Sequence, residues 1–440
     1  MRFTLPKNIL PSVTLSDEQR DALVKEADTA VQELVAANER FNSQGCTLAY
    51  PGWKLVRAKD GVQVYRQRQR AIKRKESASC MPPVLQSSFQ LKEDEYCRFH
   101  TSSSCSIIDV GSENDTVCSS MCGISSDSLM EKMRPPGVAL MALQGVLDGT
   151  LDDCMFGSVA TTDEAWMLRS SHISDRFDDA RILATLRGPT RTDPSQFLGV
   201  KWFLKEHPII FAGIVQQRDH LILESTGFTN YSTGERVGYM LLHSIKLRDI
   251  PELTHLGIIR GEMSVCYIFR QGGPGKVEIF CRGFYNSRGG MPGRLSVLIA
   301  AESAICCTGV VDYAVIKKLR WLMTHARKRT IDTNQTNSQY CGACAKKLST
   351  ISLPLARSGV SCKICFQIVC SKCSVSKKMT VFVSDNGSIL QQSVQFCLRC
   401  VHIAKQSNGW QMTQSNSSTS SASFHSLSSS WSTSASRVSR

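Results

Sequence analysis

Four pairs of cysteines constrain the fold of this chain more than any other feature of its sequence. Two residues separate the members of each pair, and the pairs are Cys341/Cys344, Cys362/Cys365, Cys370/Cys373 and Cys397/Cys400. This gap lets both sulfurs of a pair reach one metal ion, and two pairs complete the tetrahedral thiolate shell of a structural zinc ion. The sequence therefore predicts a zinc finger over residues 338–402 that holds two structural Zn2+ ions per chain. Because all eight ligands are cysteines, neither ion keeps an open position for a substrate, and we expect no catalytic zinc.

The rest of the composition favours a cytoplasmic protein. The N-terminal residues lack the apolar core of a signal peptide, and no continuous apolar run approaches the length of a membrane-spanning helix. In a reducing compartment, regularly paired cysteines indicate metal ligands. The net charge of +14 favours anionic partners such as acidic lipid head groups. The basic stretches lack interleaved aromatic residues, which argues against nucleic acid as the partner.

The sequence before the finger predicts one large domain over residues 16–326. Ser16 and Gln19 form a capping box that starts a helix, and Asp60-Gly61 marks the turn of a hairpin. A long amphipathic helix is predicted from Leu298 to Leu322. The other expected elements are short helices over 140–147 and 162–170, and strands over 53–56, 62–65, 221–224, 236–247, 261–270 and 276–285.

This order of elements predicts an α+β fold in which a curved antiparallel sheet surrounds the long C-terminal helix. The space between sheet and helix suits an apolar cavity. Outside the two folded parts we expect an N-terminal segment (1–15), a basic and polar linker (327–337) and a serine-rich tail (403–440). The tail has too little apolar surface to offset the entropy of ordering, so we expect disorder there. No pattern assigns residues 76–130.

The large domain resembles the START family of lipid-transfer domains. The order of its elements carries the resemblance, together with residues 147–153, 198–202, 218–220, 238–239 and 267–269. The resemblance implies a helix-grip fold, a START-like arrangement whose cavity holds a lipid or another hydrophobic ligand.

The finger resembles the FYVE type, because only four residues separate Cys365 from Cys370. The resemblance implies a FYVE/RING-like cross-brace in which the pairs interleave. One zinc would be held by Cys341, Cys344, Cys370 and Cys373, and the other by Cys362, Cys365, Cys397 and Cys400. FYVE domains bind phosphatidylinositol 3-phosphate on endosomal membranes through a basic motif with two histidines. Residues 358–363 stand at that place here, and Lys363 is their one basic residue.

The same resemblance suggests which residues meet a membrane. Ile351, Leu353 and Leu355 occupy the place of the membrane-inserting loop of FYVE domains, and Arg357 and Lys363 lie beside it. An apolar tip with basic neighbours suits an anionic surface. The alternative is that the apolar residues pack locally and that the lysines of the finger keep it soluble.

No catalytic signature accompanies these features. The glycine-rich stretch at residues 272–276 lacks the pattern of a phosphate-binding loop, and His172, His220 and His243 have no partner motif. We therefore expect a non-enzymatic, zinc-binding protein that binds a hydrophobic ligand or associates with endosomal or other anionic membranes. The alternative is an adaptor that uses the finger as a protein-binding surface. A third reading is a RING-like ubiquitin ligase.

Overall fold

A large antiparallel sheet forms the centre of the computed structural model. The structure describes residues 9–45, 48, 52–68, 128–206, 216–329, 339–348, 359–383 and 389–414. Nine strands follow the order β1-β2-β3-β10-β9-β7-β6-β5-β4, and the short β8 pairs in parallel with β6. The strands are β1 (Trp53–Lys59), β2 (Val62–Gln67), β3 (Leu140–Asp148), β4 (Phe177–Arg187), β5 (Phe197–Lys205), β6 (Arg218–Asn230), β7 (Arg236–Ser244), β8 (Ile259–Arg260), β9 (Glu262–Gly273) and β10 (Lys276–Asn286).

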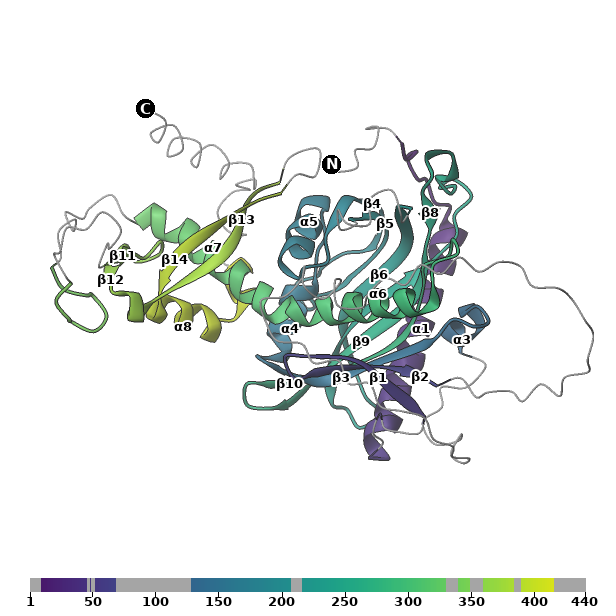
Figure 1. Cartoon of the computed structure of the whole chain (residues 1–440), viewed down its shortest axis with the longest axis horizontal. Helices are drawn as coiled ribbons and strands as arrows, with labels where there is room; N and C mark the ends of the chain where they lie inside the picture. The colour runs from purple at the N-terminus through teal and green to yellow at the C-terminus, as the bar shows by residue number, and fades with distance from the viewer. Residues whose placement is uncertain are drawn as a thin grey trace, which may run out of the picture.

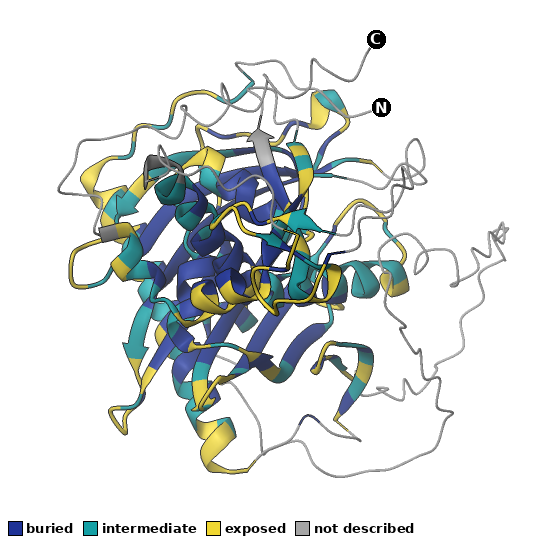
Figure 2. Ribbon diagram, turned by 90° about the vertical axis from the view of Figure 1, so that its left-hand side faces the viewer, coloured by how far each residue is buried: buried dark blue, intermediate teal, exposed yellow. Residues whose placement is uncertain are grey.

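Helices cover both faces of this sheet (Figure 1). On one face, α1 (Asp17–Ser43) packs Leu23, Val31 and Leu34 against alternate residues of the central strands, such as Leu241 and Ile268. The opposite face carries the other helices: α4 (Leu151–Ser158), α5 (Asp163–His172), α6 (Gly293–Cys306) and α7 (Val310–Arg329), while α3 (Leu129–Met133) lies beside α1. Figure 2 shows that burial is concentrated in the sheet between these layers. The expected α+β fold is therefore confirmed.

Several local predictions are confirmed as well. The Ser16 capping box is formed, since the Gln19 N–H donates to Ser16 Oγ at 3.3 Å and the Ser16 N–H donates to Gln19 Oε1 at 2.9 Å. The hairpin turns at Asp60 and Gly61, which both take positive φ angles. The helix expected over 162–170 is α5, and the strands expected between residues 221 and 285 correspond to β6, β7, β9 and β10, although β7 ends at Ser244 and not at 247.

The short helix predicted over residues 140–147 is wrong, because this segment is strand β3. It pairs with β2 on one side and β10 on the other, so it lies inside the sheet. Met141 and Leu143 face the helices α4 and α6–α7, whereas Leu140 and Ala142 pack with Trp53 on the other side. Its first four residues, Leu140–Leu143, are apolar and buried on both faces of the sheet, and this hides the two-residue period of a strand.

The single long helix predicted over 298–322 is interrupted. A turn of 3-10 helix at Cys307–Gly309 separates α6 from α7. Glycine is a poor helix former, and a Cβ on Gly309 would lie 3.3 Å from the Cα of Ile173. The run Gly293–Ala326 is nevertheless long and apolar enough, by length and composition, to cross a membrane, which the sequence pattern did not suggest. In this fold it forms α6, which packs on the sheet, and α7, which packs on α4 and α8.

The C-terminal module consists of two small hairpins and two helices, and it differs from the expected boundaries. The elements are β11 (Val360–Ser361), β12 (Ile368–Val369), β13 (Ser374–Val383), β14 (Ile389–Cys397), α8 (Leu398–Gln406) and α9 (Gly409–Gln414). The folded part therefore extends to residue 414, into the segment expected to be disordered from 403. Helix α7 likewise continues to Arg329, into the expected linker. The expectations for residues 76–127 and 415–440 lie outside the described residues.

Candidate functional site

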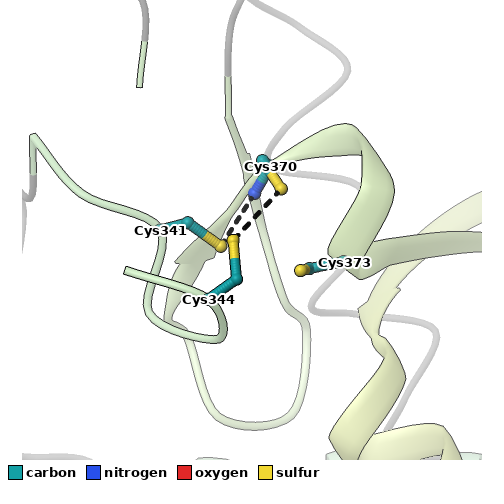
Figure 3. Close-up of side chains that lie close together, drawn as sticks. All are labelled: Cys341, Cys344, Cys370 and Cys373. Carbon is teal, nitrogen blue, oxygen red and sulfur yellow. Dashed lines mark hydrogen bonds between the residues drawn. The ribbon is translucent and has the colours of Figure 1, made fainter. Parts of the chain in front are cut away.

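Four cysteines of the C-terminal module form a first cluster (Figure 3). The Sγ atoms of Cys341, Cys344, Cys370 and Cys373 all lie within 4.8 Å of one another. Cys344 and Cys370 are 3.8 Å apart at sulfur, and the Cys370 N–H donates to Cys341 Sγ at 3.3 Å. The first pair is shaped by a tight turn in which the Ala345 N–H donates to the Cys341 carbonyl and Ala345 takes a φ of 56°.

Cys362, Cys365, Cys397 and Cys400 form a second cluster with the same construction. Cys365 and Cys397 are 3.8 Å apart at sulfur. Phe366 repeats the turn of Ala345, with a φ of 58° and an N–H that donates to the Cys362 carbonyl. The Cys400 thiol, which hydrogen-bonds to Cys362, lowers the pKa of Cys362 to about 4.

The geometry of both clusters fits a tetrahedral zinc ion. Four sulfurs that each lie about 2.3 Å from a central ion at tetrahedral angles are about 3.8 Å from one another. Both measured sulfur pairs have this separation. The grouping of the first pair with the third, and of the second with the fourth, is the interleaved arrangement that the sequence resemblance implied.

The predicted membrane contacts are mostly untested. Ile351, Leu353, Leu355 and Arg357 lie outside the described residues. Lys363 is exposed beside Cys362, and its backbone N–H donates to the Gln395 carbonyl at 3.1 Å. The structure also reveals large exposed apolar side chains on the same module, namely Tyr340, Phe366, Leu390, Leu398 and Ile403.

A pocket lies between the sheet and the α5–α6 layer, where the fold was expected to leave a cavity. Its volume is about 50 Å³, and its walls come from β3, β5, β6, β7, β9 and β10 below and from α5, α6 and the start of α7 above. The apolar lining includes Leu143, Trp166, Ile173, Phe203, Ile222, Met240, Met263, Val265, Ala300, Ala304 and Val310.

A buried group of charges contributes Arg169 and Glu224 to the lining of this pocket. Arg169 on α5 makes two hydrogen bonds with Glu224 on β6, at 3.0 and 2.7 Å, and Lys201 on β5 donates to Glu224 at 2.8 Å. Burial lowers the pKa of Lys201 to about 8. Burial alone would raise the pKa of Glu224, but the charges of Arg169 and Lys201 outweigh it and hold that pKa below its usual value. This group was not predicted from the sequence, although Lys201 and Glu224 each stand among apolar residues of a strand and were a signal for it.

Two donors on residues that line the pocket have no hydrogen-bond partner among the described residues. They are Nε of Arg169 and Oγ of Ser170, and both residues line the pocket. Arg169 is 5% exposed and Ser170 is 1% exposed. A buried polar group without a partner is costly, so these two donors indicate that a hydrogen-bond acceptor belongs in the pocket.

The three histidines considered from the sequence have structural roles in the described residues. His220 stacks on Phe203, with ring centroids 4.8 Å apart. His243 is hydrogen-bonded to Ser264 and Glu26. His172 stacks on Tyr313, and its Nε2 accepts the Thr380 N–H at 3.3 Å. Of these three histidines, only His172 contacts the C-terminal module.

The comparisons with known proteins give fold neighbours only. No family model and no curated protein matches this chain. Among solved structures, human STARD10 is 11% identical with a TM-score of 0.34, covering 72% of this chain and 86% of that one. Human StAR-related lipid transfer protein 5 is 11% identical with a TM-score of 0.36, covering 66% and 97%. The human StarD13 lipid transfer and protein localization domain is 10% identical with a TM-score of 0.33, covering 68% and 98%. At such low similarity, function has to be argued from the site itself.

Proposed function

We propose that this chain is a non-enzymatic lipid-binding protein whose pocket takes an apolar ligand with one hydrogen-bond acceptor. The observation that carries the proposal is the pair of unpartnered donors, Arg169 Nε and Ser170 Oγ, on residues that line an apolar pocket. Pockets for small hydrophobic ligands combine apolar walls with a few convergent polar groups. A hydroxyl, ester or carbonyl oxygen on the ligand would satisfy both donors.

The ligand enters this pocket only if one wall moves, because about 50 Å³ has room for little more than a water molecule. Helix α6 is the wall best suited to move. Only Ala300, Ala301 and Ile305 of this helix are buried, and its N-cap residue Pro292 makes no side-chain capping bond. Gly289 and Gly290, just before it, take positive φ angles that glycine adopts without strain. A segment with few buried contacts opens at low cost.

Lipid co-purification tests this proposal. The full-length chain, purified with its metal, is extracted and its lipids are identified by mass spectrometry. We expect one class of lipid in stoichiometric amount, and less of it in Ser170→Ala, which lacks one donor. Ser232→Ala is the control, since Ser232 is exposed and bonded to Glu39. Repeated recovery of empty, folded wild-type protein would contradict the proposal.

We further propose that the two cysteine clusters bind two structural Zn2+ ions in a FYVE-like finger. Sulfur separations that match a tetrahedral zinc shell and the interleaved order of the pairs support this assignment. Elemental analysis of purified protein should return two zinc ions per chain. A content far below two in folded protein would exclude the assignment.

The finger is also the part of the chain that we propose to meet an anionic membrane in the cytoplasm, for instance on endosomes. The described part of the finger, between residues 339 and 406, has no acidic residue and contains Lys346, Lys363, Lys372 and Arg399, beside the exposed aromatic residues Tyr340 and Phe366. Basic and apolar side chains together suit an anionic lipid surface. Sedimentation with vesicles of neutral lipid, of phosphatidylserine, and of either with phosphatidylinositol 3-phosphate tests both binding and specificity.

The exposed apolar residues of the finger also support a second candidate function, that of a protein-binding adaptor. Aromatic residues and arginine are enriched at protein–protein interfaces. Binding to a purified partner that survives in detergent, together with no binding to any vesicle, would favour the adaptor over the membrane-binding protein.

A further inference from the structure

The C-terminal module shares an apolar core with α7, the helix whose first residue lines the ligand pocket. Helix α7 contributes Val310 to the pocket at its N-terminal end. Further along, Ile316 and Leu319 belong to the same buried cluster as Val401 and Ala404 of α8, and α8 packs directly against α7. Helix α7 thus leads from the edge of the pocket to the finger, and it packs against α4 as well as α8 (Figure 1).

Helix α8 is positioned by the second cysteine cluster. Cys397 is the N-cap residue of α8, and its Sγ accepts the Cys400 N–H at 3.4 Å. Cys400 lies in the first turn of the helix. Two of the four sulfurs of this cluster are therefore fixed to α8, and the other two, on Cys362 and Cys365, belong to the β11–β12 region. A metal ion in this cluster would join the start of α8 to the rest of the finger.

Two further contacts connect the module to the helices around the pocket. Trp410 of α9 packs edge-on against Phe156 of α4, with ring centroids 4.9 Å apart. On the β13–β14 hairpin, Thr380 Oγ1 is 2.8 Å from Ser171 Oγ, and the side-chain amide of Gln391 donates to the Ser171 carbonyl at 3.2 Å. Ser171 directly follows Arg169 and Ser170, which line the pocket.

We propose that metal occupancy of the cluster Cys362, Cys365, Cys397 and Cys400 controls how firmly α7 holds the edge of the pocket at Val310, next to the mobile wall α6, and so how fast the pocket exchanges its ligand. The ligand half of this inference rests on the proposed lipid binding, whereas the coupling between metal and α7 does not. When the metal leaves, the four sulfurs no longer share a centre, α8 loses its anchor, and the apolar contact of Val401 with the α7 core loosens.

The test follows α7 and the pocket as zinc is removed from the loaded full-length chain by graded chelation. Hydrogen exchange of α7 and alkylation of Cys307 are read peptide by peptide, since Cys307 is 5% exposed and lines the pocket. We expect both rates to rise several-fold as the metal of this cluster is lost, while exchange in α1, on the far face of the sheet, stays unchanged. Release of a fluorescent phosphatidylcholine loaded into the same protein should accelerate in parallel.

A pair of matched variants separates the coupling from general loss of stability. Val401→Ser weakens the contact with α7 but keeps all eight cysteines, whereas Ile403→Ser makes the same type of change at a residue that is 42% exposed. We expect the Val401→Ser protein to keep two metal ions, and we expect its Cys307 to be alkylated faster than in wild type even when the fluorescent lipid is bound. The Ile403→Ser protein should behave as wild type.

The outcomes of these experiments distinguish the coupling between metal and α7 from the proposed lipid binding. Complete loss of zinc with unchanged α7 exchange and Cys307 labelling would overturn the inference, as would equal behaviour of the two variants. Faster Cys307 labelling in a protein that never binds the fluorescent lipid would leave the coupling supported and remove the proposed lipid-binding function.

Discussion

Gly157 on α4 lies directly against the backbone of Val310, the first residue of α7. A Cβ on Gly157 would overlap the Val310 carbonyl, with its carbon only 2.7 Å away. Because the obstacle is backbone, it cannot turn aside as a side chain does, and α4 and α7 approach this closely only with glycine at position 157.

The first prediction follows from this contact. Gly157→Ala should destabilise the chain by about 1–3 kcal/mol, the usual cost of overpacking a core, and thermal or urea unfolding measures the loss. Gly188→Ala is the matched control, since a Cβ there would meet nothing within 4 Å. Equal midpoints for the two variants would show that α4 and α7 do not pack as described.

The buried charges around Glu224 give a second prediction. Glu224→Gln leaves Arg169 and Lys201 buried with no carboxylate, and breaking a buried ion pair in this way costs about 3–5 kcal/mol. Lys201→Met should cost less, because Glu224 keeps both hydrogen bonds from Arg169. Urea unfolding of the two variants checks the order, and a larger loss for Lys201→Met would contradict it.

Acid sensitivity is the third prediction, and it concerns His172. Burial, and after it the charge of Arg320, lowers the pKa of His172 to about 4. Only a neutral imidazole accepts the Thr380 N–H, so the docked state holds His172 unprotonated. When the contact opens, the pKa returns toward about 6.5. The stabilisation is therefore complete above about pH 6.5 and is progressively lost as the pH falls toward 4.

Hydrogen exchange of the β13–β14 hairpin, followed from pH 7 to pH 4, measures this effect after correction for the intrinsic rate. His172→Gln keeps a hydrogen-bond acceptor that does not titrate, so hydrogen exchange of the hairpin should depend less on pH in this variant. His402→Gln, at an exposed position on α8, serves as the control. If the hairpin opens at the same pH in His172→Gln and in wild type, another group is responsible for the acid sensitivity.

The two cysteine clusters should lose their metal at different rates, which is the fourth prediction. In the first cluster only Cys341 is buried, whereas Cys362, Cys397 and Cys400 are all buried in the second. A chelator reaches exposed thiolates sooner, so a colorimetric chelator should record two phases of equal amplitude. We expect Cys344→Ser to remove the fast phase and Cys365→Ser to remove the slow one. A single phase in wild type would show that the clusters are equally accessible.

Local chemistry explains what could be predicted from the sequence. The capping box at Ser16, the turn at Asp60-Gly61 and the two-residue gaps between cysteines each encode geometry within a few residues. The interleaving of the cysteine pairs, in contrast, was implied by the resemblance to FYVE fingers, which rests on the short gap between Cys365 and Cys370. These features need no knowledge of distant contacts.

Features that depend on distant contacts could not be predicted in this way. Strand β3 is apolar on both faces, so Leu140, Leu143 and Leu147 match a helical period by coincidence. The donors Arg169 Nε and Ser170 Oγ become significant only once the pocket places them without partners. The contact between Trp410 and Phe156 joins residues far apart in the sequence, and nothing near Trp410 predicts it.

The common core of α7 and α8 has a practical consequence for dividing the chain. A fragment that ends near residue 330 would keep α7 but remove Val401 and Ala404, leaving the apolar stripe around Ile316 and Leu319 in water. Contiguous apolar surface of this kind promotes self-association. Such a fragment would aggregate for reasons unrelated to the ligand pocket, and so would a finger expressed without α7.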